Sequence, residues 1–257
     1  MEVQLGGRRV HLRVESNKPR KLKYNLIAAR EQGHHTLVTF GGAYSNHLRA
    51  TALAGRLHGF QTVGIVRGEE RLPLNPVLRF ATEQGMTLTY VDRETYRGKL
   101  IPAGLPPHYL IPEGGSNELA VRGCAELGEE LGSAFDVVCV PAGTGGTLAG
   151  LAAGLRHGRA IGFAVLKDAG WLRDAVATLQ QRTYGEVRGN WSIETRFHFG
   201  GYAKTPPALL TFVDKFEAQH GLRLDPIYTG KMMSGLETLL HHGTFPQHER
   251  ICAVITG

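Results

Sequence analysis

The sequence predicts an α/β protein with two domains, each built on a parallel β-sheet. Short apolar strands alternate with helix-length segments along most of the chain, which is typical of βα units. The 257 residues are 42% hydrophobic and 20% charged, as in proteins with a well-formed core. A Pro/Gly-rich stretch, IPAGLPPHYLIPEGGSN, interrupts the alternation after three units. We therefore expect residues 35–118 to form a small domain, residues 1–34 and 119–257 to form a large one, and a ligand cleft to lie between them at the carboxyl ends of the strands.

The first half of the chain contains three strand–helix units. TLVTF is a short apolar strand, and the loop GGAYSN leads from it into the helical segment HLRATALAGRLHG. QTVGIVRG is the second strand. The helical segment NPVLRFATEQG begins behind an Asn-Pro signal and ends at Gly85, and TLTYVD follows as the third strand.

The second half continues the same pattern. Asn117 is placed to cap a helix that reaches about Leu131. FDVVCV is fully apolar, which indicates a strand buried on both faces, and PAGTGGTLAG leads from it into a helix ending near Gly158. The strand AIGFAVL, the helix GWLRDAVATLQQR and the strand ICAVIT complete the expected sheet.

Composition narrows the class of partner. The net charge of +6 and the pI near 9.3 suit an anionic ligand, but no basic stripe interleaved with aromatic residues occurs, so we expect no nucleic-acid partner. No apolar run approaches the roughly 20 residues of a membrane helix, and the N-terminus does not resemble a signal peptide. The three cysteines are far apart and form no CxxC pair, which favours a reducing cytoplasm. The histidine pairs lack further ligands at metal spacing, so we expect no metal site.

A glycine-rich loop between a buried strand and a helix is the clearest candidate for a ligand site. Its backbone N–H groups and two hydroxyls can surround a phosphate in front of the helix N-terminus; the residues concerned are Gly143, Thr144, Gly145, Gly146 and Thr147. The loop lacks the Lys-Ser/Thr of a Walker motif, and Leu148 stands where a dinucleotide fingerprint has its third glycine. The loop therefore indicates a phosphorylated ligand other than a nucleotide, and the alternative is a tight turn without a ligand.

A second loop, GGAYSNHLR, leaves the strand TLVTF in the same way. Its polar residues Ser45, Asn46 and His47 lie at the mouth of a helix, where backbone donors suit a carboxylate. The alternative is an ordinary helix cap formed by Ser45 or Asn46.

The run SNKPRKLKYN contains three lysines. Pro19 suits the first turn of a helix, whose apolar residues Leu22, Leu26 and Ala29 then form one stripe. Lys18 lies within tens of degrees of that stripe, Lys21 flanks it, and Lys23 lies well away on the solvent side. A desolvated lysine can act as a nucleophile or form a Schiff base, and the alternative is that Lys18 extends into solvent.

Taken together, these motifs resemble a known family. SNKPRKLKYN, FGGAYSNHLRATA, IPEGGSNELAVRGCAELGEEL, VPAGTGGTLAGLAAGL, DPIYTGKMMSGL and the terminal VITG occur in the order found in the 1-aminocyclopropane-1-carboxylate deaminase/D-cysteine desulfhydrase family. That family belongs to the tryptophan-synthase-β-like, fold type II enzymes that use pyridoxal phosphate (PLP). The resemblance extends from about Val14 to Gly257 and implies PLP as cofactor, bound in the cleft by the large domain of a homodimer.

The resemblance also implies roles for individual residues. The cofactor would be held through a Schiff base with Lys18, a hydrogen bond from Asn46 to its ring oxygen, and a hydroxyl near its pyridine nitrogen from Thr256. Its phosphate would be bound by the five residues of the glycine loop, Gly143 to Thr147. The residues near the substrate would be Ser45, Asn46, His47, Tyr202 and Tyr228.

The implied reaction is a lyase/deaminase reaction that gives a 2-oxo acid and ammonia. Thr229 stands where the family's ring-opening deaminases carry Glu, and His47 where they carry Gln, so β-elimination of the D-cysteine desulfhydrase type is favoured. The alternatives are 1-aminocyclopropane-1-carboxylate deaminase activity and a PLP-binding protein with little turnover, since Glu15-Ser16 precede Asn17 where relatives have glycine. An alternative of another class is a nucleotide-dependent oxidoreductase that uses residues 143–150.

Overall fold

The structure is a computed structural model that describes residues 1–256, and its contacts divide the chain into two compact units. The larger unit contains Met1–Asn17 and the chain from Cys124 onward, and the smaller unit contains Lys18–Gly123. The smaller unit thus includes residues 18–34, which we expected in the large domain. The reason lies in the packing of their helix, whose apolar stripe contacts Leu37, Phe60 and Ile111 of the smaller unit.

The larger unit is built on a six-stranded sheet with the order β1-β2-β10-β7-β8-β9. The strands are β1 (Glu2–Leu5), β2 (Arg8–Val14), β7 (Val137–Ala142), β8 (Arg159–Ala164), β9 (Trp191–Glu194) and β10 (Ile251–Ile255). All neighbours are parallel except β1 and β2, which form an antiparallel hairpin. The carboxyl ends of β10 and β7 therefore lie at the same edge of the sheet.

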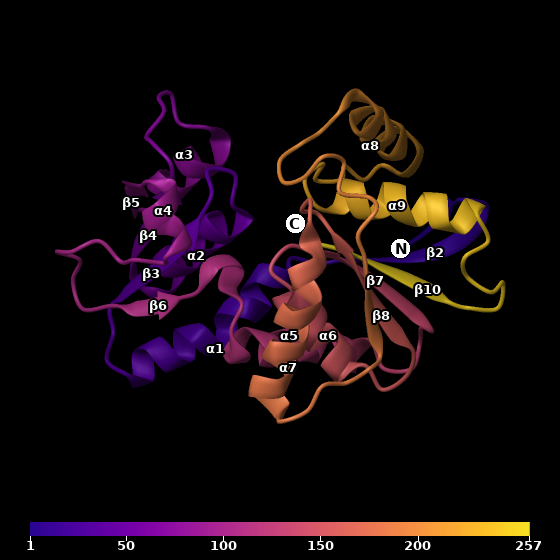
Figure 1. Ribbon diagram of the computed structural model, residues 1–257, viewed down its shortest axis with the longest axis horizontal. Helices are drawn as coiled ribbons and strands as arrows, with labels where there is room; N and C mark the ends of the chain where they lie inside the picture. Colours follow the sequence, from indigo (N-terminus) through magenta and orange to yellow (C-terminus); the bar gives the residue numbers. More distant parts are fainter. Residues whose placement is uncertain (257) are drawn as a thin grey trace. The chain divides into compact units, whose positions relative to one another are not determined.

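Helices cover both faces of this sheet. They are α5 (Glu118–Leu131), which enters from the smaller unit, α6 (Gly146–Gly154), α7 (Leu172–Tyr184), α8 (Pro207–His220), α9 (Thr229–His241) and the short η2 (Ala169–Trp171). Met232 and Leu236 of α9 pack with Phe163 and other strand residues in the main core cluster. Leu148 of α6 packs against Gly162. Gly162 and its neighbour Phe163 face opposite sides of the sheet, because successive strand residues alternate between the two faces. Helices α6 and α9 therefore cover opposite faces. Figure 1 shows α9 running along the sheet on the face away from α6.

The smaller unit has a four-stranded, all-parallel sheet with the order β5-β4-β3-β6. Its strands are β3 (Thr36–Gly41), β4 (Gln61–Arg67), β5 (Met86–Val91) and β6 (Tyr109–Ile111). Its helices are α1 (Asn17–Glu31), which starts in the larger unit, α2 (Asn46–His58), α3 (Pro76–Glu83), α4 (Arg93–Arg97) and the short η1 (Glu113–Gly115). The mixed α/β class with parallel sheets is the predicted one.

Local signals explain where several helices begin and end. The side chain of Asn75 accepts hydrogen bonds from the backbone N–H groups at the start of α3, and that of Asn117 accepts one from Ala120 at the start of α5, at 2.9 Å. Helix α6 ends at Gly154 rather than near Gly158, so the expected end was wrong by about a turn. Gly158 instead has a φ of +74° and forms a turn into β8, and Leu155 has already left the helical conformation.

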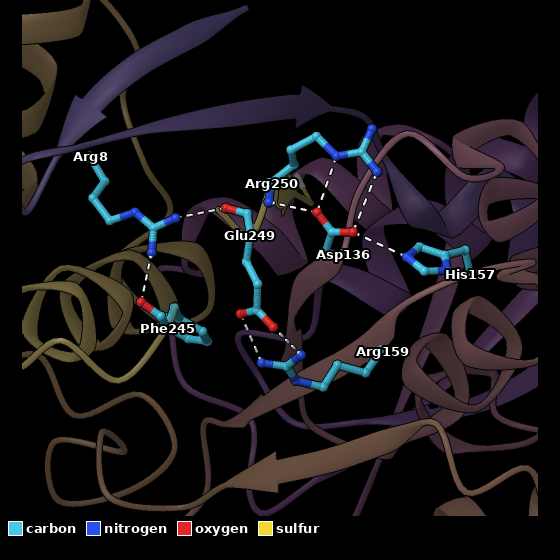
Figure 2. Close-up of polar contacts among 7 residues, drawn as sticks. All are labelled: Arg8, Asp136, His157, Arg159, Phe245, Glu249 and Arg250. Atoms are coloured by element: carbon cyan, nitrogen blue, oxygen red, sulfur yellow. Dashed lines mark hydrogen bonds and ion pairs between the residues drawn. The ribbon is translucent and has the colours of Figure 1, made fainter. Parts of the chain in front are cut away.

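A network of ion pairs lies at the amino ends of the parallel strands of the larger unit (Figure 2). Arg159 and Glu249 form a bidentate pair at 2.6 and 3.0 Å, and Arg250 bonds Asp136 at 3.1 Å. Arg8 donates to the carbonyl of Glu249 at 2.7 Å. Asp136 directly precedes β7, whereas the glycine loop follows that strand, so the network lies at the other end of the strand and stabilises the fold away from the candidate site.

Candidate active site

The glycine loop leads from β7 directly into α6. Gly145 is the N-cap of α6, with a φ of +82°, and no side chain caps the helix there. A Cβ on Gly145 would lie 2.8 Å from a methyl carbon of Val176, so the position requires glycine for both its conformation and its space. The first N–H groups of α6 therefore face the loop without a capping side chain, and such a helix N-terminus binds phosphate well. The loop fits the phosphate group of PLP.

A buried hydrogen bond joins the glycine loop to the segment before Lys18. Asn17 Nδ2 donates to Thr147 Oγ1 at 2.8 Å, and both residues are only 6% exposed. The chain just before Asn17 is held by strand pairing, since β2 lies beside β10 and the N–H of Glu15 donates to the carbonyl of Ile255 at 3.0 Å. Lys18 is the next residue in the chain and is half-buried.

Tyr228 lies beside the same loop, and Tyr202 packs against Tyr228. The rings of Tyr202 and Tyr228 meet edge to face, with centroids 6.2 Å apart. Tyr228 precedes α9, and its Cε1 atom is 3.5 Å from the position that a Cβ on Gly143 would occupy. Thr256 is buried directly after β10, at the sheet edge that carries the loop. The larger unit thus brings together the predicted phosphate loop, both predicted tyrosines and the predicted terminal threonine.

In the smaller unit, Ser45 is the N-cap of α2, and its Oγ accepts from the N–H of Leu48 at 3.4 Å. The capping interpretation of this serine is therefore correct, and it leaves the hydroxyl at the helix mouth together with half-buried Asn46. The carboxylate-binding role of this loop stays a prediction, as does the role of each predicted site residue.

His47 lies at the start of α2, as expected, but its side chain is buried within the smaller unit. Its Nε2 is 2.8 Å from Thr39 Oγ1, and that hydroxyl donates to the carbonyl of Ile111 at 2.8 Å. The hydroxyl must then accept the Nε2 proton, so Nδ1 is the nitrogen that is left without a proton when the ring is neutral. Burial first, and then the positive charges of Lys21 and Lys18, hold the pKa of His47 well below its ordinary value. Nδ1 has no hydrogen-bond partner in the part of the chain that the structure describes.

The helix phase did not identify the most buried lysine of the N-terminal run. Lys21 is 4% exposed and donates to the carbonyl of Gly114 at 2.8 Å and to Ser116 Oγ at 3.2 Å. Lys23 is exposed, as predicted. The available signal was Asn25, one turn after Lys21, because a second polar residue on that side indicates a buried polar face next to the apolar stripe.

Comparison with known proteins identifies the family. The family model described as "Pyridoxal-phosphate dependent enzyme" matches residues 10–257. The chain belongs to this family of PLP-dependent enzymes. It is 32% identical over 96% of its length to the "Putative 1-aminocyclopropane-1-carboxylate deaminase" of Pyrococcus furiosus, covering 81% of that protein. It is 29% identical over 94% of its length to a D-cysteine desulfhydrase of Salmonella choleraesuis, again covering 81%.

The solved structures agree with this membership. A crystal structure described as an ACC deaminase homologue superimposes with a TM-score of 0.82 at 28% identity, covering 96% of this chain and 84% of that one. The predicted fold class and the predicted PLP cofactor are therefore confirmed.

Two features are absent from residues 1–256. No cluster of three or more His, Cys, Asp or Glu side chains in this range could hold a metal ion. In the same range, no helix is long and apolar enough to span a membrane.

Proposed function

We propose that this PLP-dependent enzyme is a lyase/deaminase of the D-cysteine desulfhydrase type. It would remove the β-substituent of a small amino acid; D-cysteine and water would give pyruvate, ammonia and hydrogen sulfide. The observation that carries the proposal is the buried 2.8 Å hydrogen bond from Asn17 to Thr147. It fixes the residue that precedes Lys18 to a loop suited to hold the cofactor's phosphate.

PLP, when bound, supplies an electron sink for negative charge that develops at the α-carbon of the substrate. Lys18 would hold the cofactor covalently. Once the substrate's amine has displaced it, the free amine of Lys18 would remove the α-proton as a general base. The N–H groups and hydroxyls from Gly143 to Thr147 would hold the phosphate throughout.

The residues at the start of α2 would bind the substrate's carboxylate. The backbone N–H groups at the start of α2 and the hydroxyl of Ser45 suit this task. Asn46 would hydrogen-bond the ring oxygen of the cofactor. Because the ring of His47 is bonded to Thr39, His47 would contribute its backbone N–H rather than its side chain.

Two threonines favour elimination over the other reactions of the family. The hydroxyl of Thr229 bonds the backbone carbonyl of Asp225 at 3.3 Å, and Thr229 is fully buried, so this position offers no carboxylate for ring opening. Thr256 near the pyridine nitrogen would leave the cofactor ring less fully protonated than an Asp would, which disfavours transamination. The second candidate activity is 1-aminocyclopropane-1-carboxylate deamination, which the names of two similar proteins support.

We also propose a cellular compartment and an oligomeric state for the enzyme. Cys124, Cys139 and Cys252 are buried thiols, which suits a reducing cytoplasm. The family resemblance favours a homodimer, which light scattering on the purified protein would test.

A visible spectrum and a substrate panel test the proposal. The purified protein should absorb at the wavelength of lysine-bound PLP, and Lys18→Ala should abolish the band, while the exposed Lys23→Ala should keep it. 2-Oxo acid release should be fastest with D-cysteine among D-cysteine, L-cysteine, serine, β-chloroalanine and aminocyclopropane carboxylate. Fastest release from aminocyclopropane carboxylate would favour the second candidate. Release from none of them, by a protein that carries the cofactor, would refute both.

A further inference from the structure

A lysine that has no role in the proposed reaction is buried inside the larger unit. Lys231, on the first turn of α9, is 1% exposed. Its Nζ donates to the carbonyl of Gly201 at 2.7 Å and to that of Val165 at 3.3 Å. Burial lowers its pKa to about 8, and the only charged group that acts on it among the described residues is Asp225, which acts in the opposite direction. Burying an ammonium is costly unless its hydrogen bonds are made, so these two carbonyls are what keeps it in place.

The two carbonyls belong to segments that carry the candidate site. Val165 directly follows β8, and its N–H donates to the carbonyl of Ala142, the last residue before the glycine loop. Gly201 directly precedes Tyr202 in the chain. Lys231 itself follows Tyr228 by three residues on α9. One ammonium therefore connects the ends of two strands, the Tyr202 segment and the helix that follows Tyr228.

The segment that carries Tyr202 has an unusual backbone. Four of its residues have positive φ values, which are 53° at Phe199, 89° at Gly200, 116° at Gly201 and 57° at Ala203. Phe199 and Ala203 are not glycine, so their Cβ atoms disfavour this conformation. A strained segment of this kind persists only where its surroundings hold it, and the bond from Lys231 comes from a helix outside the segment.

We propose that Lys231 is a positioning residue, which holds the Tyr202 segment against the end of β8 and so keeps the ring of Tyr202 against Tyr228 beside the glycine loop. The inference rests on the proposed function and on the expectation, from the family resemblance, that both tyrosines lie near the substrate. Without the ammonium the segment would relax and the two rings would separate. The glycine loop would keep its own conformation, so binding and turnover of the substrate would suffer while cofactor binding would not.

Lys231→Met tests this inference, because methionine keeps the length of the side chain and removes its donors. Lys215→Met, at an exposed position on α8, is the matched control. In the PLP-loaded enzyme, Lys231→Met should speed amide hydrogen exchange in residues 198–204 and lower kcat/KM for D-cysteine on the order of tenfold to a hundredfold. Its PLP affinity should equal that of the wild type, and the control should match the wild type in all three measurements.

Wild-type exchange in residues 198–204 of Lys231→Met would overturn the inference. So would an unchanged kcat/KM, or a loss of PLP affinity as large as the loss of kcat/KM, since that would show a general structural role. If Lys231→Met does not fold, Gly201→Ala perturbs the same segment with Lys231 in place, because its Cβ would lie 3.3 Å from that of Lys167. It should show the same selective loss, and an unchanged kcat/KM would overturn the inference. If the wild type releases no 2-oxo acid from any substrate, the proposed function fails, while the exchange measurement still decides the role of Lys231.

Discussion

The hydrogen bond between Asn17 and Thr147 is the link on which the proposed site depends, and its strength can be measured. Asn17→Ala and Thr147→Val each remove one partner of a buried 2.8 Å bond. A buried group that loses its partner costs about 1–3 kcal/mol, so each variant should lower the free energy of unfolding by that amount. The double variant should cost less than the sum of the two, and the difference should be about 1 kcal/mol. If the free energy of unfolding falls by about 2 kcal/mol per molar urea, that difference shifts the urea midpoint of unfolding by roughly 0.5 M.

Urea unfolding followed by tryptophan fluorescence is a suitable assay. The two tryptophans, Trp171 and Trp191, both belong to the larger unit, which contains Asn17 and Thr147. The signal therefore reports the unit in which the bond lies. The contrary outcome is a loss of unfolding free energy in the double variant that equals the sum of the two single losses to within about 0.3 kcal/mol. That result would show that the two side chains are not coupled, and would refute the reasoning.

Other perturbations separate the cofactor loop from the rest of the larger unit. Gly145→Ala forces a side chain into a left-handed conformation at a cost of about 1–2 kcal/mol and should weaken PLP affinity. The control Gly185→Ala, at a φ of +77° in open space, should lower stability without changing PLP affinity. Equal PLP affinities of the two variants in a titration would contradict this. Hydrogen bonds from arginine hold the pKa of Asp136 below its usual range, so its stabilisation is complete above the unfolded pKa of about 4 and is lost as the pH falls towards the folded value. The melting temperature of Asp136→Asn should therefore lie below that of the wild type at pH 7 and approach it below pH 4; a gap that does not change with pH would contradict this. Burial raises the pKa of the Cys252 thiol to about 12. The native protein should therefore react with Ellman's reagent far more slowly than the unfolded chain, which has three thiols. A rapid reaction of the native protein would be inconsistent with the fold.

Elements with local signals could be predicted from the sequence. The apolar runs of β3, β7 and β10 and the caps of α3 and α5 are each encoded within a few residues. The β1–β2 hairpin was not predicted, although Val3, Leu5, Val10 and Leu12 alternate with polar residues, which is a strand signal that the sequence does contain. Those four residues reach the core because β2 pairs with β10, which comes from the far end of the sequence. The local sequence of β2 does not show which strand it pairs with.

The site shows the same division between local and distant information. The glycine loop and the Ser45 cap are local, and both could be predicted as loops at the end of a strand. The burial of Lys21 depends on Gly114 and Ser116, and that of Lys231 depends on Val165 and Gly201. Lysine is rarely buried, so only the long-range pairing could identify these two.

The central claim is that Lys18 carries the cofactor, and one measurement tests it directly. The PLP-loaded protein is reduced with borohydride, which fixes the cofactor on the lysine that holds it, and the modified peptide is sequenced by mass spectrometry. The account predicts modification of Lys18, three residues before the buried Lys21 and five before the exposed Lys23. Modification of Lys21, or of any other lysine in place of Lys18, would contradict it.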